Sequence, residues 1–311
     1  MCTRVFQSGS DGAKVVGRTL DFSQEANPHM WWLPAGRENR GGSAVDAVTW
    51  VSRFGSLVIT DLDGWCVDGV NECGLAAHSL MFTSAMYEQS DDRRSLGTGM
   101  WVSYLLDTCS TVSEALAALA ELRVTPDRVL GQDLGVHLAI EDASGDSAVI
   151  EPVEGVMVVR HGRQYRVMAN SPSLDEHLVN LNRYRPFGGE LPPPGDVTSL
   201  DRFVRASYFL HYVPEPTDPR QAAVEVMQVL QTVAKPLGVP YPDGDIYPTR
   251  WMSAMDLQNL DYYFWSRTSP QAVWLNLRDV ADSGAPLCVD LMTRGLTSDI
   301  GTNMLPITTA R

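Results

Sequence analysis

The chain has 311 residues, of which 44% are apolar and 20% charged, and its formal net charge is −14. This length allows a large core, and since sandwiches of this size occur as single units, we expect one domain over residues 1–311. The negative charge argues against a nucleic-acid partner, because phosphate binding depends on clustered Lys and Arg. No stretch approaches the ~20 apolar residues of a membrane span. We therefore expect a globular protein without nucleic-acid or membrane partners.

The chain begins Met1-Cys2-Thr3-Arg4. Because the Cys side chain is small, we expect removal of Met1, which leaves a cysteine with a free α-amine. A free thiol has a pKa of about 8.5 and an α-amine titrates at roughly 7.7–8.0, so one residue carries a nucleophile and a base. Nucleophilic catalysis uses this pairing. The alternative is an ordinary cysteine near a frayed chain end.

The next residues predict a β-hairpin that fixes the N-terminus in a sheet. Residues 3–6 and 15–22 have strand character, and Ser10-Asp11-Gly12 between them is typical of a turn. Arg18 and Asp21 lie near the end of the second strand, opposite the start of the first. An arginine beside a thiol favours the thiolate, and a carboxylate can orient an α-amine. Each residue alone is also compatible with an exposed edge hairpin.

The rest of the chain alternates blocks of strands with pairs of helices. Two such blocks suggest two stacked sheets covered by helices. Before them, His29-Met30-Trp31-Trp32-Leu33-Pro34 is interpreted as an apolar loop. In chain order, the patterns predict strands at 56–60, 65–67 and 74–80, helices at 98–107 and 115–122 with a capping box at 111–114, a meander at 136–141, 148–151 and 156–160, helices at 174–184, 201–212 and 219–234, and strands at 251–256, 262–266 and 272–277.

Several motifs extend the argument beyond the N-terminus. They are Asp68-Gly69-Val70-Asn71-Glu72-Cys73-Gly74-Leu75, His161-Gly162-Arg163-Gln164-Tyr165, Met168-Ala169-Asn170-Ser171-Pro172 and Pro248-Thr249-Arg250-Trp251, the last followed by Asp256-Leu257 and Tyr262-Tyr263-Phe264. Together with Cys2, Arg18 and Asp21, they resemble the choloylglycine hydrolases, N-terminal-nucleophile amidohydrolases that include conjugated bile acid hydrolases and penicillin V acylases. The resemblance implies an α+β fold, a four-layer αββα sandwich, without a cofactor, and a homotetramer.

The resemblance also assigns roles to single residues. Asn170 would donate a hydrogen bond to the oxyanion of the tetrahedral intermediate, a role that can supply ~3–4 kcal/mol; on its own it is also typical of a turn. The backbone N–H of Met81 would be a second donor. Relatives usually carry Asn or Tyr at the position aligned with Met81, so this chain departs from the family there. Arg250 would support the nucleophile and the acidic residue beside it.

The substrate is predicted more coarsely than the chemistry. Trp31 and Trp32, with Met81 and Phe82, are candidates for an acyl-binding wall, although exposed apolar residues also form plugs or oligomer contacts. The patterns at 33–37 and 161–163 resemble the Gram-negative penicillin V acylase branch. We therefore expect a small N-acyl amide substrate with a phenoxyacetyl or long acyl chain, for example an N-acyl homoserine lactone. Alternatives are a conjugated bile acid hydrolase, an acyltransferase with the same acyl-enzyme, or a binding protein with an inactive site.

The remaining cysteines and histidines predict no metal site. Five cysteines without a C-x-x-C spacing fit neither a disulfide framework nor a zinc site, although a bridge between Cys66 and Cys73 across a turn is conceivable. The six histidines are scattered. No secretory signal precedes Cys2, which predicts a cytoplasmic protein, or a periplasmic one if a native signal peptide were removed directly before Cys2.

Overall fold

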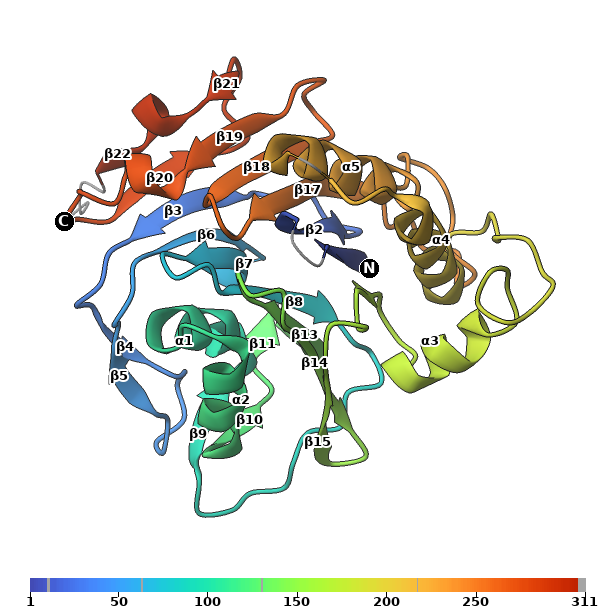
Figure 1. Ribbon diagram of the computed structural model, residues 1–311. Helices are drawn as coiled ribbons and strands as arrows, with labels where there is room; N and C mark the ends of the chain where they lie inside the picture. The colour runs from blue at the N-terminus through green and yellow to red at the C-terminus, as the bar shows by residue number, and fades with distance from the viewer. Residues whose placement is uncertain (10–11, 63, 130, 217, 307–311) are drawn as a thin grey trace.

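Two large β-sheets stacked face to face form the centre of the protein, and helices cover both outer faces (Figure 1). The structure is a computed structural model that describes residues 1–9, 12–62, 64–129, 131–216 and 218–306. The predicted turn residues Ser10 and Asp11 lie outside this part of the chain.

The first sheet contains the N-terminal hairpin. Its seven strands follow the order β16 (Val167–Met168), β1 (Cys2–Ser8), β2 (Lys14–Asp21), β17 (Thr249–Asp256), β18 (Asp261–Ser266), β19 (Val273–Asn276) and β21 (Ser298–Asp299). β1 and β2 are antiparallel, and Cys2 lies opposite Leu20. The predicted hairpin is therefore confirmed, and it occupies the middle of the sheet instead of an edge.

The second sheet has nine strands and contains the start of the motif at residues 68–75, which lies in β7 (Trp65–Asn71). The strand order is β15 (Val156–His161), β14 (Ser147–Val153), β13 (Val136–Glu141), β8 (Ala76–Met81), β7, β6 (Ser56–Asp61), β3 (His29–Leu33), β20 (Leu287–Asp290) and β22 (Leu305–Pro306). Smaller pairs join β4 (Glu38–Arg40) to β5 (Thr49–Val51), β9 (Arg94–Gly97) to β10 (Leu122–Thr125), and β11 (Arg128–Val129) to β12 (Gln132–Asp133).

Helices cover the outer faces of both sheets. α4 (Ser199–Tyr212) and α5 (Pro219–Gln231) pack on the sheet that holds β1 and β2, with α3 (Leu174–Leu181) beside α4, whereas α1 (Trp101–Thr108) packs on β7 and β8 and α2 (Val112–Ala120) lies beside β10 (Figure 1). Short 3₁₀ turns occupy Thr98–Met100, Leu277–Asp279 and Gly301–Asn303. The fold is therefore an α+β, four-layer αββα sandwich, as predicted.

Local sequence signals explain several of these boundaries. The Thr111 hydroxyl caps α2 by accepting a hydrogen bond from the backbone N–H of Glu114. The predicted capping box is only half formed, since the Glu114 carboxylate accepts from the backbone N–H of Ser110 instead. Gly17 lets α5 approach β2 closely, because a Cβ there would lie 2.6 Å from the Ser253 carbonyl oxygen and 2.8 Å from a methyl group of Val226.

The apolar segment at residues 29–34 is not a loop, and this prediction is corrected. Residues His29–Leu33 form β3, which pairs with β6 on one side and β20 on the other. Trp32 is 2% exposed, and its ring fills the space beside Gly55, where a Cβ would lie only 2.2 Å from it. The pattern is short, so only the pairing with two distant strands defines it as a strand.

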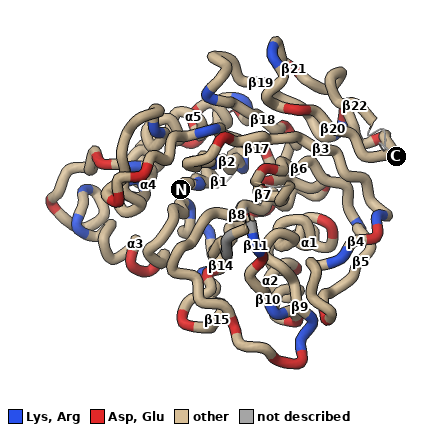
Figure 2. Tube along the Cα trace, turned by 180° about the vertical axis from the view of Figure 1, so that it is seen from behind, with Lys and Arg blue, Asp and Glu red and all other residues tan. Residues whose placement is uncertain are grey.

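Charged residues are not confined to the surface. Figure 2 shows acidic and basic residues spread over the whole trace, some of them beside β1, β2 and β7 in the interior. Arg4, Arg18 and Arg202 are among the largest fully buried side chains. Buried charges are stable only with partners, which makes the space between the N-terminal hairpin and its neighbours a candidate site. Among the helices of the described residues, none is both long and apolar enough to cross a bilayer.

Candidate active site

The Cys2 thiol lies at the first residue of β1, where it is 5% exposed. Nη2 of Arg18 is 3.1 Å from Sγ of Cys2. The other sheet fixes this guanidinium, because Nη1 donates to the carbonyl oxygens of Val67 (2.9 Å) and Ser79 (2.8 Å). The guanidinium also lies 5.1 Å from the ring centroid of Trp251. The predicted pairing of Cys2 with Arg18 is therefore present, with the arginine held from both sheets.

This environment separates Cys2 from the other four cysteines. Burial opposes ionisation, but Arg18 and the nearby α-ammonium outweigh it, so the pKa of the Cys2 thiol lies below its ordinary value. Burial raises the pKa of Cys66 to about 12 and that of Cys288 to about 11, and it also raises the pKa of Cys73 and Cys109. All five are free thiols, and the described residues contain no cluster of three or more metal-binding side chains.

Asn170 connects the first residues of β1 to the second sheet. Its Oδ1 accepts hydrogen bonds from the backbone N–H of Cys2 (2.5 Å) and from Nη2 of Arg202 (2.9 Å), and its Nδ2 donates to the Met81 carbonyl oxygen (2.6 Å). Ser199 donates to the Asn170 carbonyl oxygen. The structure therefore places Asn170 where it orients the main-chain nitrogen of Cys2. Its role as an oxyanion donor, and that of the Met81 N–H, stay predictions.

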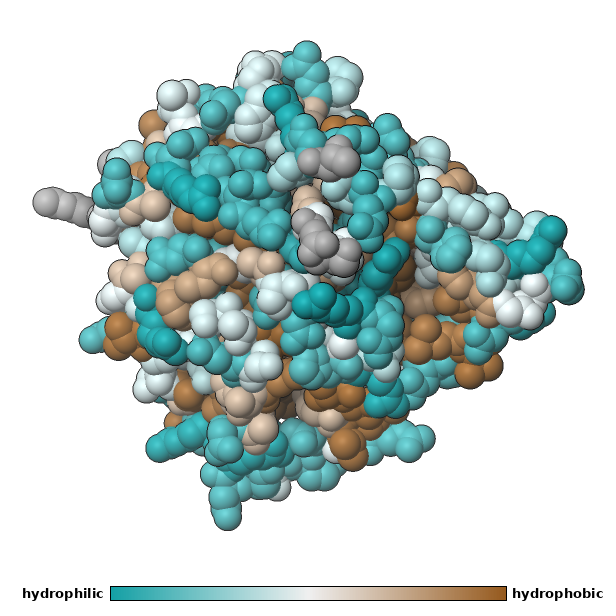
Figure 3. All heavy atoms as spheres, viewed as in Figure 1, coloured by the Kyte–Doolittle hydropathy of each residue, from teal (hydrophilic) through white to brown (hydrophobic). Residues whose placement is uncertain are grey.

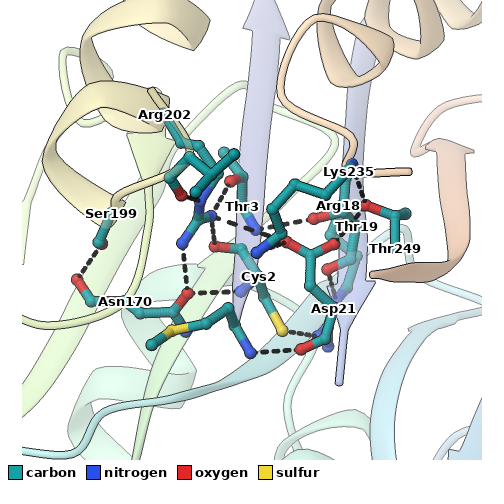
Figure 4. A network of polar contacts seen from close by, with 12 residues as sticks. Cys2, Thr3, Arg18, Thr19, Asp21, Asn170, Ser199, Arg202, Lys235 and Thr249 are labelled. Carbon is teal, nitrogen blue, oxygen red and sulfur yellow. Dashed lines mark hydrogen bonds and ion pairs between the residues drawn. The ribbon is translucent and has the colours of Figure 1, made fainter. Parts of the chain in front are cut away.

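Asp21 ends β2 beside the start of β1, as the hairpin predicted. Its Oδ1 accepts a hydrogen bond from the Thr249 hydroxyl (2.6 Å). Its Oδ2 lies 3.2 Å from Nζ of Lys235 and 3.9 Å from Nη1 of Arg202. The Asp21 carbonyl oxygen accepts from the α-amino group of Met1. Figure 4 shows this carboxylate, the two cations and Asn170 arranged around the first residues of the chain.

Arg202 is a site residue that the sequence reasoning missed. Its Nη1 donates to the Cys2 carbonyl oxygen (2.5 Å) and to the Thr3 hydroxyl, while Nη2 reaches Asn170. The guanidinium is fully buried. A signal for it exists in the sequence, since Arg202 stands on the helical stripe of Ala206 and Leu210, and a charge on an apolar stripe is unusual. Its partner in space, however, is 200 residues away.

Arg250 does not contact the nucleophile or the Asp21 carboxylate, so the predicted direct support is corrected. Its Nε donates to the Phe22 carbonyl oxygen (2.9 Å), its Nη2 donates to that of Ser23 (2.6 Å), and its Nη1 pairs with Glu25 (2.6 Å). Thr249 pairs with Asp21 and Trp251 with Leu20, which leaves Arg250 as the extra residue of a β-bulge. Arg250 therefore fastens the segment that follows Asp21.

The four predicted substrate residues lie in different environments. Trp32 is a core residue whose Nε1 donates to the Ser283 carbonyl oxygen, and Phe82 is 1% exposed and stacked on His137. Both are therefore corrected to structural residues. Trp31 is half-buried and lines a cavity of about 420 Å³ together with residues 24–25, 27, 29, 60–62 and 64. Met81 is half-buried and touches the site through Asn170.

Known proteins are similar to this chain in sequence and in structure. Residues 2–285 match the family described as linear amide C-N hydrolases, choloylglycine hydrolase family. The chain is 32% identical over 292 residues to a penicillin V acylase of Pectobacterium atrosepticum, covering 86% of this chain and 77% of that protein. It is 26% identical over 298 residues to a bile salt hydrolase/transferase of Bifidobacterium longum, covering 85% and 91%.

The fold comparison agrees with the sequence comparison. The structure of penicillin V acylase from Agrobacterium tumefaciens superposes with a TM-score of 0.88 at 32% identity, covering 98% of both chains. A conjugated bile acid hydrolase variant from Clostridium perfringens gives a TM-score of 0.81 at 21% identity, which shows a common fold. With its match over nearly the whole length, this chain belongs to the choloylglycine hydrolase family of linear amide C–N hydrolases.

Proposed function

We propose that the protein hydrolyses the linear amide bond of an N-acyl substrate through a thioester on Cys2, after Met1 has been removed. The observation that carries the proposal is the contact of 3.1 Å between the Cys2 thiol and Arg18 at the first residue of a central strand. The same residue presents its main-chain nitrogen to Oδ1 of Asn170. Removal of Met1 turns that nitrogen into an α-amine next to the thiol.

Each step then has a group to perform it. The neutral α-amine of Cys2 takes the thiol proton as Sγ attacks the carbonyl carbon. The resulting oxyanion needs donors such as the Asn170 amide or the Met81 N–H. When the C–N bond breaks, the α-ammonium of Cys2 gives its proton to the leaving amine, and a thioester remains. The neutral α-amine next takes a proton from water, whose oxygen attacks the thioester carbon. The C–S bond breaks, the carboxylic acid leaves, and the α-ammonium returns its proton to the sulfur.

The cavity beside Trp31 is proposed as the acyl-binding site. Its walls include Gln24 and Glu25, which lie three and four residues after Asp21, and Asp61, which accepts a hydrogen bond from Nε1 of Trp251. The Trp251 ring lies under the Arg18 guanidinium, so the cavity and the thiol share supporting residues. A second cavity, of about 290 Å³ between α3 and α4, is lined by none of the residues that surround Cys2. An acyl group with an aromatic or aliphatic end suits the Trp31 wall.

A hydrolysis panel tests the proposal. Penicillin V, glycocholate and N-acyl homoserine lactones of several chain lengths are compared by release of the free amine. We expect turnover of penicillin V or of a long-chain lactone above that of glycocholate, and preference for glycocholate would favour the bile acid alternative. A further assay with a competing amine tests for acyl transfer. We include it because one relative is described as a bile salt hydrolase/transferase. No turnover of any amide would contradict the proposal.

Replacement of Trp31 by alanine is expected to change the order of acyl-chain preference. The variant removes apolar surface at about 25 cal/mol per Å² from a half-buried wall, so KM is expected to rise more for phenoxyacetyl or long chains than for short ones. Trp32→Ala is the matched control on the same strand. It empties a core position, which costs about 3–5 kcal/mol of folding stability. Steady-state kinetics and thermal melts separate the two, and an unchanged ranking in Trp31→Ala would remove this cavity from the proposal.

We also propose a homotetramer, as the resemblance implies. Apolar side chains are exposed on the helices, among them Val179 (71%), Tyr212 (59%) and Phe209 (40%). Figure 3 shows brown surface gathered over the lobe that carries α3. Such patches are typical of protein contacts. Light scattering coupled to size exclusion should give four times the chain mass of 34.2 kDa, and a monomer mass at micromolar concentration would contradict this assembly.

The cellular location of the protein, in the cytoplasm or in the periplasm, stays a prediction.

A further inference from the structure

Lysine is used very sparingly in this protein. The sequence holds 22 arginines but only two lysines, Lys14 and Lys235. Both are buried, at 4% and 5% exposure. Lys14 opens β2, and its ammonium donates to the carbonyl oxygens of Gly9 and Gly12 beside the hairpin turn. Lys235 follows α5 and lies at the opposite end of β2, against Asp21. A lysine in that position calls for a separate explanation.

The surroundings of Lys235 come from several elements. Nζ lies 3.2 Å from Oδ2 of Asp21 at the end of β2 and 5.1 Å from the ring centroid of Tyr241. Its backbone N–H donates to the Thr249 hydroxyl, which in turn donates to Oδ1 of Asp21. Arg202, from α4, approaches the same Oδ2 to 3.9 Å. Lys235 therefore fixes the Asp21 carboxylate twice, once through its charge and once through Thr249.

We propose that Lys235 is a positioning residue that holds the Asp21 carboxylate and balances its charge, so that the α-amine of Cys2 is neutral near pH 7. The inference rests on the proposed function, in which this amine is the base. A carboxylate near an amine favours the charged ammonium form, and a second cation on the same carboxylate opposes that effect. In the described part of the chain, the charged side chains that pair with the Asp21 carboxylate are Lys235 and Arg202, while the Met1 α-amine binds the Asp21 carbonyl oxygen and Tyr241 covers the lysine.

The same charged groups act on the α-amine of Met1, which the structure contains. Burial lowers the pKa of the Met1 α-ammonium to about 6; Cys2 and Asp21 raise it, while Lys235 and Arg202 lower it. The main-chain nitrogen of Cys2, one residue further along, donates to Oδ1 of Asn170, which also accepts from Nη2 of Arg202. Lysine suits the position because its ammonium is a compact charge with three donors, whereas guanidinium is a planar fork.

The test is the pH profile of kcat/KM in Lys235→Met. Without the lysine, the Asp21 charge is less balanced, the pKa of the α-amine rises, and the acid limb of the profile moves to higher pH, by about one unit. At pH values below the shifted pKa of the α-amine, kcat/KM is expected to be about tenfold lower than in the wild type, and it should recover at alkaline pH. Lys235→Arg keeps a positive charge and should return the acid limb of the kcat/KM profile to its wild-type pH. Lys14→Met is the matched control, a buried lysine at the far end of the same strand, and should leave the limb in place.

A structural role would give a different result. A loss by the same factor at every pH, or an unmoved limb in folded Lys235→Met, would overturn the inference. If that variant does not fold, NMR of protein carrying ¹³C at lysine Cε replaces it, because only two lysine signals exist and Lys14→Arg assigns them. The pKa of Lys235 should fall in Asp21→Asn as the carboxylate charge is lost, and an unchanged pKa would overturn the pairing.

The same samples distinguish this inference from the proposed function. Alkylation of Cys2, confirmed by peptide mapping, should abolish hydrolysis. Hydrolysis that survives complete alkylation would reject the thioester mechanism as a whole. Hydrolysis that is lost on alkylation, together with an unmoved acid limb in Lys235→Met, would reject the role of Lys235 alone.

Discussion

Replacement of Cys2 by serine is expected to lower kcat/KM by about 10³-fold or more, because a catalytic unit that loses its nucleophile retains little activity. A hydroxyl is far less ionised than a thiol whose pKa Arg18 holds below its ordinary value. The fold should survive, since serine has nearly the same shape and Arg18 keeps its contacts with Val67 and Ser79. Amine release under saturating and limiting substrate, with a thermal melt of the same sample, measures both effects.

Cys73→Ser is the control for this variant. Cys73 is exposed, but its pKa is raised by partial burial and by the neighbouring Glu72, so it should contribute nothing to turnover. Iodoacetamide at neutral pH should label Cys2 ahead of the four other cysteines in the mature protein, because the thiolate is the reactive form. Wild-type turnover in Cys2→Ala would contradict the assignment of the nucleophile.

Retention of Met1 is expected to lower activity by about 10²–10⁴-fold, the contribution of a positioned general base. With Met1 in place, the nitrogen of Cys2 is a peptide N–H that donates to Asn170, and it has no free electron pair to accept a proton. The Met1 α-amino group binds the Asp21 carbonyl oxygen, so the added residue also occupies the space before the thiol. A chain extended by Ser-Gly before Cys2, which aminopeptidase leaves intact, imitates this state.

Intact-mass spectrometry defines which form is active. The active fraction should have the mass of a chain that begins at Cys2, and the extended chain should still melt cooperatively, as the matched control for folding. Cleavage of a removable leader directly before Cys2 should restore turnover in the same sample. Full activity in protein shown to keep Met1 would be incompatible with an α-amine base.

Local sequence signals were sufficient for much of the fold. The hairpin, the meander of β13 to β15 and the helices α4 and α5 follow from alternation, turn residues and helical periodicity, all of which act over a few neighbouring residues. β3 could not be recognised in this way. Its five residues resemble any short apolar run, and it becomes a strand because β6 and β20, far away in sequence, supply the backbone partners.

The sequence by itself also determined the placement of Cys2, Arg18 and Asp21, because a hairpin with a short turn brings the start of one strand to the end of the next. Only the tertiary structure decided the rest of the site. Arg202 reaches the first two strands from α4 and Lys235 from the segment that follows α5, each some 200 residues away. A bulge in β17 directs Arg250 to the segment after Asp21. The reason is physical: buried charges must meet partners wherever the chain folds back, and no local pattern encodes which partner that is.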